Sequence, residues 1–149
     1  MMKLTFNQER HEYQLNGNIV PAVTQITSSL IDLSAIPQDV LEHKRQIGTA
    51  LHKAIELHLA DDLVLDSVAE QVRPYFDAFL KFMADTGFKP RNSEYRVASE
   101  IYQYAGTLDM DGYMKGKLSV VDFKTTSVLH PATALQTAAY LQAANETGD

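Results

Sequence analysis

The chain has 149 residues, 45% of them hydrophobic, and a formal net charge of -6, which predicts one domain spanning residues 1–149 with its own core. The absence of cysteine excludes disulfides, thiolate zinc sites and cysteine-bound iron-sulfur clusters, and the acidic charge argues against nonspecific coating of nucleic acid. No apolar run approaches the length of a membrane helix, about 20 residues, and the polar start is unlike a secretory signal, so we expect a cytoplasmic protein without a membrane partner.

The first segment predicts a small β-hairpin. Phe6 and residues 11–15 lead into the dipeptide Asn16-Gly17, and residues 19–21 return from it. Asn-Gly is a strong signal for a two-residue hairpin turn because both residues tolerate a positive φ.

One short helix and two longer helices are predicted after this hairpin. Residues 23–30 favour a short helix capped by Ser or Thr, and residues 33–37 form a connection. Apolar residues at helical spacing then predict a helix over residues 37–61, with proline in its first turn. A second helix is predicted over residues 68–84, where Gly87 ends it.

The last third of the chain changes from helix to strand and back. Residues 94–124 predict a three-stranded meander, and Pro131 opens a final helix that ends near Asn145. The order of hairpin, helices, meander and helix is typical of an α/β or α+β domain, in which helices pack on a sheet.

Two aspartates and a lysine form the motif with the clearest chemistry: Asp109, Asp122 and Lys124. A turn centred on Lys115-Gly116 would place Asp109 opposite Asp122 in an antiparallel pair, with Cβ atoms about 5 Å apart. Lys124 would share the face of Asp122 because strand side chains alternate. One residue of slip would reverse every side chain, so this register stays open at the level of sequence.

Two carboxylates at this separation need a partner. At an effective dielectric constant near 20 they repel by roughly 3 kcal/mol, so either one pKa rises or a cation binds. We favour a hard divalent cation such as Mg²⁺, which keeps several waters when carboxylates hold it. Lys124 could then orient water or stabilise charge on a phosphate. The alternative is a surface hairpin whose charged side chains are merely solvated.

His52 and Glu94 are candidates to join this pair. His52 lies four residues after Gly48 on one helix face, and a glycine inside a helix costs about 1 kcal/mol, which suggests that backbone or substrate approaches there. The alternative is an ordinary histidine on a half-buried helix. His58 lies roughly 240° around the helix from His52, so the two do not pair. Without an HExxH motif, a zinc metalloprotease is not supported.

Polar and basic side chains elsewhere could contact a substrate. Gln136 and Tyr140 lie four residues apart and share a helix face, where buried polar groups need partners. Ordinary surface positions are the alternative for both residues. Five basic residues are candidate phosphate contacts, with plain solvation as the alternative for each: Lys44, Arg45, Lys53, Arg91 and Arg96.

Five short motifs, taken in order, resemble the PD-(D/E)xK nuclease superfamily, and most of all its branch of RecB-type domains and phage lambda exonuclease-like enzymes. The motifs are GTALH (48–52), EYRV (94–97), GTLD (106–109), VDFKT (121–125) and QTAAY (136–140). Residues 11–26 are also similar to the lead-in of phage and prophage members of the superfamily. The resemblance implies a restriction-endonuclease-like α/β core, in which helices flank a central mixed β-sheet, with the N-terminal hairpin added to it.

The resemblance also implies roles for single residues. The implied metal ligands are His52, Asp109, Asp122 and the carbonyl of Phe123. Lys124 would be the catalytic lysine and Glu94 an accessory acid. The implied substrate-side pair is Gln136 with Tyr140. The metal would be Mg²⁺ or Mn²⁺, without the iron-sulfur cluster that four cysteines hold in other branches.

From this resemblance we expect a metal-dependent DNA nuclease, an exonuclease of phage or prophage origin that acts on linear DNA ends in recombination or processing, with a phage recombination partner. A structure-selective or restriction-type endonuclease and an inert DNA- or protein-binding module are the alternatives. Members commonly continue past the Gln-x-x-x-Tyr helix with another strand, whereas this chain ends nine residues after Tyr140. We therefore expect either missing C-terminal elements or a homo-oligomer that covers the open edge.

Overall fold

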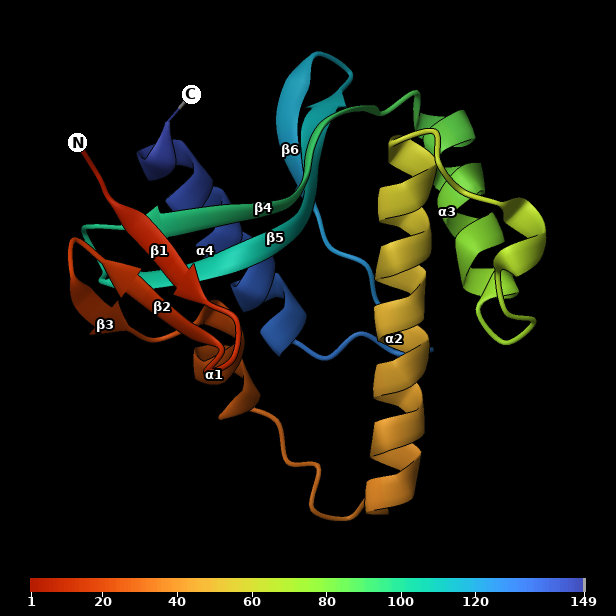
Figure 1. Cartoon of the computed structure of the whole chain (residues 1–149), viewed down its shortest axis with the longest axis horizontal. Helices are drawn as coiled ribbons and strands as arrows, with labels where there is room; N and C mark the ends of the chain where they lie inside the picture. The colour runs from red at the N-terminus through yellow and green to blue at the C-terminus, as the bar shows by residue number, and fades with distance from the viewer. Residues whose placement is uncertain (149) are drawn as a thin grey trace.

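Two small antiparallel sheets and two layers of helix make up residues 1–148, the part of the chain that the computed structural model describes (Figure 1). The first sheet has the order β1-β2-β3, from Leu4–Asn7, Glu12–Leu15 and Asn18–Val20. Asn16 and Gly17 have φ values of 52° and 87° in the turn between β2 and β3. These positive values are those of a tight hairpin turn, so the predicted hairpin is confirmed.

The second sheet is the predicted meander, with the order β4-β5-β6 from Lys89–Ser99, Tyr104–Met114 and Lys117–Val121. Met110 pairs with Val121 and Met114 with Lys117, which is the register that a turn at Lys115-Gly116 predicts. The meander begins at Lys89 rather than at Glu94 and ends at Val121, before Asp122.

The expectation of one central mixed sheet is not met by residues 1–148. Both sheets are antiparallel, and the parallel contact between them is an isolated bridge from Ala22 to Ala105. Short turns join consecutive strands within each sheet, and such turns produce antiparallel neighbours, whereas parallel neighbours need a long crossover. The first sheet packs on the second through Tyr13 and Leu15, which meet Ala98 and Ala105.

The helices are α1 (Val23–Ser28), α2 (Gln38–Leu59), α3 (Arg73–Thr86) and α4 (Ala132–Thr147), with a short 3-10 turn η1 at Leu65–Ser67. The predicted limits of α2 are confirmed to within two residues. Gly87 ends α3 in the left-handed conformation, as predicted. Pro131 precedes α4, which continues two residues past the predicted end at Asn145.

α1 begins at Val23 as predicted, but the predicted cap of α1 and the predicted start of α3 are wrong. No Ser or Thr caps α1; instead the side chain of Gln25 accepts a hydrogen bond of 2.9 Å from the N–H of Ala22. The α3 helix begins at Arg73 rather than at Val68, because proline in its first turn sets the start and the residues before it form η1 and a turn.

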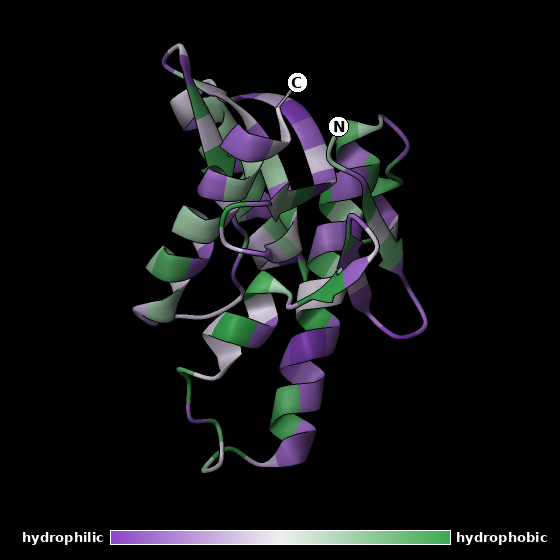
Figure 2. Cartoon of the chain, turned by 90° about the vertical axis from the view of Figure 1, so that its left-hand side faces the viewer, coloured by the Kyte–Doolittle hydropathy of each residue, from purple (hydrophilic) through white to green (hydrophobic). Residues whose placement is uncertain are grey.

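The core consists of three apolar clusters, and the sheet of β4–β6 is shared among them. One cluster joins α2 and α3 to that sheet and includes Phe76, Phe79 and Met110. Another lies under α4 and includes Leu108 and Tyr140. The long helix α2 carries hydrophilic and hydrophobic residues in alternation, as expected for a helix with one buried face (Figure 2). No helix within residues 1–148 combines the length and the apolar character needed to cross a membrane.

Candidate metal centre

Three side chains with metal-binding groups converge between α2 and the strands β4 and β5: His52, Glu94 and Asp109. One ligand atom from each lies within 4.8 Å of the others. The Nδ1 atom of His52 is 3.3 Å from Glu94 Oε1 and 3.5 Å from Asp109 Oδ1. The imidazole therefore lies between two carboxylates that come from neighbouring strands.

His52 is positioned by the packing of α2. Its neighbour Leu51 and the next buried residue on that face, Ile55, fix α2 in the apolar cluster with α3. The imidazole ring meets Phe123 edge-on, with 6.0 Å between ring centroids. As predicted, His58 does not join His52: its ring contacts Phe76 and Phe79 on the α3 side.

Glu94 is brought to the cluster by an unusual backbone. Ser93 pairs with Met110 and Tyr95 with Leu108, so Glu94 lies across from Asp109. Its φ of 49° is in the left-handed region, which costs a non-glycine residue about 1–3 kcal/mol. Strain of this kind clusters at functional sites, where the surrounding structure maintains it.

Asp109 is held in one orientation. Its Oδ2 accepts a hydrogen bond of 2.7 Å from the backbone N–H of Phe123, which leaves Oδ1 directed at His52. Burial raises the pKa of Asp109 to about 6, His52 opposes the rise, and the charge of Asp122 adds to it. Only 11% of the side chain is exposed, so burial disfavours its charged form.

The same contacts favour the charged form of His52. Its pKa is raised mainly by the hydrogen bond with Glu94, with smaller contributions from the charges of Asp109 and Glu94 and from the backbone of Phe123, while burial opposes the rise. An imidazolium between two carboxylates thus balances the charge of the metal-free cluster. A bound cation would take over that role and displace the protons.

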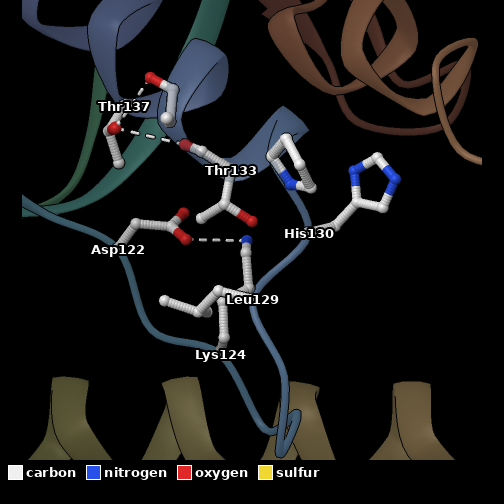
Figure 3. Close-up of a pocket in the computed structure, with 8 residues that line it drawn as sticks. Asp122, Lys124, Leu129, His130, Thr133 and Thr137 are labelled. Atoms are coloured by element: carbon white, nitrogen blue, oxygen red, sulfur yellow. Dashed lines mark hydrogen bonds and ion pairs between the residues drawn. The ribbon is translucent and has the colours of Figure 1, made fainter.

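Asp122 and Lys124 form a second charged group next to this cluster. Lys124 Nζ is 2.7 Å from Asp122 Oδ2 (Figure 3), and the Asp122 side chain is only 3% exposed. Despite this ion pair, Oδ2 accepts no well-oriented hydrogen bond from any residue in the range 1–148. A buried carboxylate oxygen in this state is costly, and a cation or ordered water would relieve the cost. Asp122 does not belong to the group of three that lies within 4.8 Å.

A groove of about 650 Å³ separates Asp122 and Lys124 from the start of α4 (Figure 3). His130 Nδ1 accepts a hydrogen bond of 3.0 Å from the N–H of Ala132, so the proton of the neutral ring belongs on Nε2. In Figure 3 the imidazole points away from the Asp122–Lys124 pair. The groove is lined by Asp122, Lys124, Leu129, His130, Pro131, Thr133, Ala134 and Thr137.

Gln136 and Tyr140 lie on α4, with the ring of Tyr140 buried. Burial raises the pKa of Tyr140, a hydrogen bond with Gln136 opposes the rise, and the charges of Asp109 and Asp122 add to it. Because Tyr140 is only 3% exposed, Gln136 is the more accessible of the two.

The glycine of the GTLD motif has a packing role that sequence reasoning missed. A Cβ atom on Gly106 would lie 2.7 Å from Cε1 of Tyr140, which is closer than real contacts allow. The other motif glycine behaves differently: a Cβ on Gly48 would meet only the hydroxyl of Thr125, at an ordinary 3.9 Å. The expected close approach of protein backbone at Gly48 is therefore wrong, while approach of a substrate remains a prediction.

The candidate phosphate contacts differ in their surroundings. Arg91 is structural, because it donates to the buried carboxylate of Asp111 at 2.7 Å where β4 has a bulge. Arg45 pairs with Glu42, and Lys53 pairs with Glu56. Arg96 lies over an aromatic ring, with its guanidinium carbon 5.0 Å from the ring centroid of Phe6.

In comparisons with known proteins, no family model and no curated protein matches the chain. The cluster therefore has to be interpreted from its own donor atoms. Two carboxylates and one imidazole are a donor set that suits hard and borderline divalent cations and not soft, thiolate-seeking ones.

Proposed function

We propose that the chain is a divalent-metal-dependent nuclease that hydrolyses DNA phosphodiester bonds, as an exonuclease in DNA recombination or processing. The observation that carries this proposal is the convergence of His52, Glu94 and Asp109 within 4.8 Å. The paired Asp122 and Lys124, which follow the next strand, add the acid and the lysine that phosphodiester hydrolysis uses.

Mg²⁺ or Mn²⁺ suits the residues present. The buried Asp109, whose pKa is raised, is a group that a cation would stabilise, and Asp122 adds a second buried carboxylate. His52, Glu94 and Asp109 would hold the ion, and the family resemblance adds Asp122 and the Phe123 carbonyl. When bound, such an ion supplies a Lewis acid for the phosphate and lowers the pKa of its water.

The protein side chains position the reacting groups. The N–H of Phe123 fixes one oxygen of Asp109, so the other stays directed at the cluster. Asp122 holds the ammonium group of Lys124 at 2.7 Å, which keeps a positive charge beside the groove where phosphate charge would develop. Gln136 would contact the substrate strand, and the buried Tyr140 would support it from α4.

A cleavage assay with end-labelled linear DNA and closed circular DNA tests this proposal. We expect linear DNA to be degraded from its ends with Mg²⁺ or Mn²⁺, and no cleavage with chelator. Glu94→Gln and Asp109→Asn should each lower the rate at least about 100-fold, because loss of a metal ligand costs more than loss of its supporting contacts. Glu70→Gln, at an exposed position outside the site, is the matched control.

Two results would change the assignment. Nicking of closed circles at the rate of linear cleavage would assign the chain to the endonucleases. Full activity in both ligand variants, or equal activity with chelator, would remove the basis of the metal-dependent reaction.

A further inference from the structure

One face of the β4–β5 ladder continues from the metal cluster to a guanidinium group. Arg96 pairs with Thr107 across the two strands. Glu94 and Asp109 lie two residues further along the same strands and, because side chains alternate, on the same face. Two strand residues advance about 6.6 Å, so the side chains of Arg96 and Thr107 adjoin the cluster on this face.

Arg96 differs from several other basic residues of the chain in having no carboxylate partner within residues 1–148. Arg45, Lys53 and Lys124 each pair with a carboxylate. Arg96 is exposed, and its charge lies near an acidic cluster. The guanidinium is therefore accessible to an anion from outside the chain.

Aromatic residues of the N-terminal hairpin hold Arg96 in place. Its guanidinium carbon lies over the ring of Phe6, 5.0 Å from the centroid, and Phe6 in turn contacts Tyr13 and His11, with ring centroids 4.6 and 5.2 Å away. The hydroxyl of Tyr13 bonds Thr107 Oγ1 at 2.8 Å, and this contact ties the hairpin to β5 beside the cluster. A cation–π contact takes up no N–H group in a hydrogen bond, so the guanidinium can still donate to an anion.

We infer that Arg96, oriented by Phe6, binds a backbone phosphate of the nucleic-acid strand, one to two nucleotides from the bond that is cleaved. This inference rests on the proposed function. Phosphates of one DNA strand advance about 3.4 Å per nucleotide along the helix axis, so the roughly 6.6 Å between Arg96 and the cluster along the strand corresponds to about two nucleotides. Arginine forms two parallel hydrogen bonds with phosphate, so it fixes the register of the strand as well as attracting it.

Two substitutions separate this role from simple packing on Phe6. Arg96→Met keeps an apolar side chain over the ring and removes the charge, whereas Arg96→Lys keeps a charge. Arg73→Met is the matched control, because Arg73 lies on α3 and pairs with Asp77. Binding of short labelled single-stranded and duplex oligonucleotides is measured with Ca²⁺ at several salt concentrations, and thermal stability is measured in parallel.

We expect Arg96→Met to weaken binding about fivefold to tenfold at low salt and to reduce the salt slope by about 0.7 for a single strand, the loss of one phosphate contact. Arg96→Lys should keep the slope, and Arg73→Met should match the wild type in both. In cleavage, Arg96→Met should raise KM more than it lowers kcat.

The outcomes distinguish this inference from the proposed function. Wild-type affinity and salt slope in Arg96→Met would overturn the inference, and so would a loss of thermal stability without a change in binding. A wild-type protein that binds oligonucleotides through Arg96 but cleaves none would overturn only the nuclease proposal. A wild-type protein that does not bind the oligonucleotides would overturn the inference.

Discussion

The environment of Asp109 makes the stability of the metal-free protein depend on pH. Its pKa rises from 3.8 to about 6, so the folded state binds more protons than the unfolded state between these two values. The free energy of unfolding therefore falls as pH rises from about 4 to about 6. Above pH 6 it stays about 3 kcal/mol lower, the amount that corresponds to this shift of the Asp109 pKa. His52 adds to the trend, because its stabilising charge is lost as pH rises through its raised pKa.

Asp109→Asn should remove much of this dependence. The variant keeps the size of the side chain and carries no charge, so we expect metal-free stability at pH 7 to increase by about 1–3 kcal/mol, with little change at pH 4. Urea denaturation in chelator at both pH values measures the change. An identical pH profile in the wild type and in Asp109→Asn would contradict the raised pKa.

Metal affinity should have the opposite pH dependence. A cation competes with the protons of Asp109 and His52, so binding of Mn²⁺ should tighten as pH rises from 5.5 to 7.5, by up to about tenfold per unit for each proton released. Calorimetry in two buffers of different ionisation enthalpy measures both the affinity and the protons. Glu70→Gln should behave as the wild type, whereas Glu94→Gln should bind weakly. Affinity that is independent of pH would argue against ligation by these two residues.

Lys124→Ala should lower kcat much more than DNA affinity, because the ammonium group acts where charge develops in the transition state. The substitution also leaves the Asp122 carboxylate buried without its ion pair, which should cost about 1–3 kcal/mol of stability. The double variant Asp122→Asn with Lys124→Ala should regain much of that stability. Single-turnover cleavage and denaturation separate the two effects. Near-normal cleavage by Lys124→Ala would show that the lysine has no part in cleavage and serves only as the ion-pair partner of Asp122.

At the scale of elements, two glycines provide a matched pair of tests. Alanine at Gly106 would place its Cβ 2.7 Å from the ring of Tyr140, so β5 or α4 has to shift, and we expect a loss of about 1–3 kcal/mol. Alanine at Gly48 meets only Thr125 at 3.9 Å and should raise stability by up to about 1 kcal/mol, because alanine favours the helix.

Activity measurements on the same variants test whether substrate approaches α2. If it does, Gly48→Ala should be more stable and yet cleave DNA more slowly, since the added methyl group occupies space beside His52. Gly48→Ala with improved stability and unchanged cleavage would remove the functional reason for this glycine. A stable Gly106→Ala would mean that the ring of Tyr140 moves freely.

Local signals in the sequence were sufficient for the hairpins. The turn at Lys115-Gly116 sets the pairing of Met110 with Val121, because a tight turn and strand alternation fix the register between them. The start of α3 was missed because apolar spacing outweighed the proline in its first turn. The mixed sheet came from family resemblance alone, and tight turns between neighbouring strands produce antiparallel sheets instead.

The candidate site was predictable in part for similar reasons. Asp109 and His52 were predicted as partners, and they lie 3.5 Å apart. The position of Glu94 across from Asp109 could have been found from the turn at residues 100–103, which sets the pairing of β4 with β5. Its left-handed backbone could not, because nothing in the local sequence favours a positive φ at glutamate. The course of the chain from Asp122 to Lys124 depends on tertiary contacts beyond the end of β6.

At the scale of the whole molecule, the three side chains of the candidate metal cluster come from two parts of the structure. His52 belongs to α2, whose apolar cluster with α3 is separate from the clusters under α4 and under the N-terminal sheet. Glu94 and Asp109 belong to the central ladder of β4 and β5. The metal cluster therefore lies at the junction of the helical layer with the sheet (Figure 1).

At this place a bound ion would connect two parts of the protein that could otherwise open separately. Segments with their own apolar clusters can unfold locally while the remainder of the protein stays folded. Bound Mn²⁺ should therefore slow amide hydrogen exchange in α2 and α3 more than in the N-terminal sheet, an effect that mass spectrometry resolves by segment. His52→Ala should abolish the difference. Uniform slowing of hydrogen exchange across the chain would contradict this prediction. It would show that α2 and α3 open together with the sheets, so that the metal-free protein unfolds as one cooperative unit.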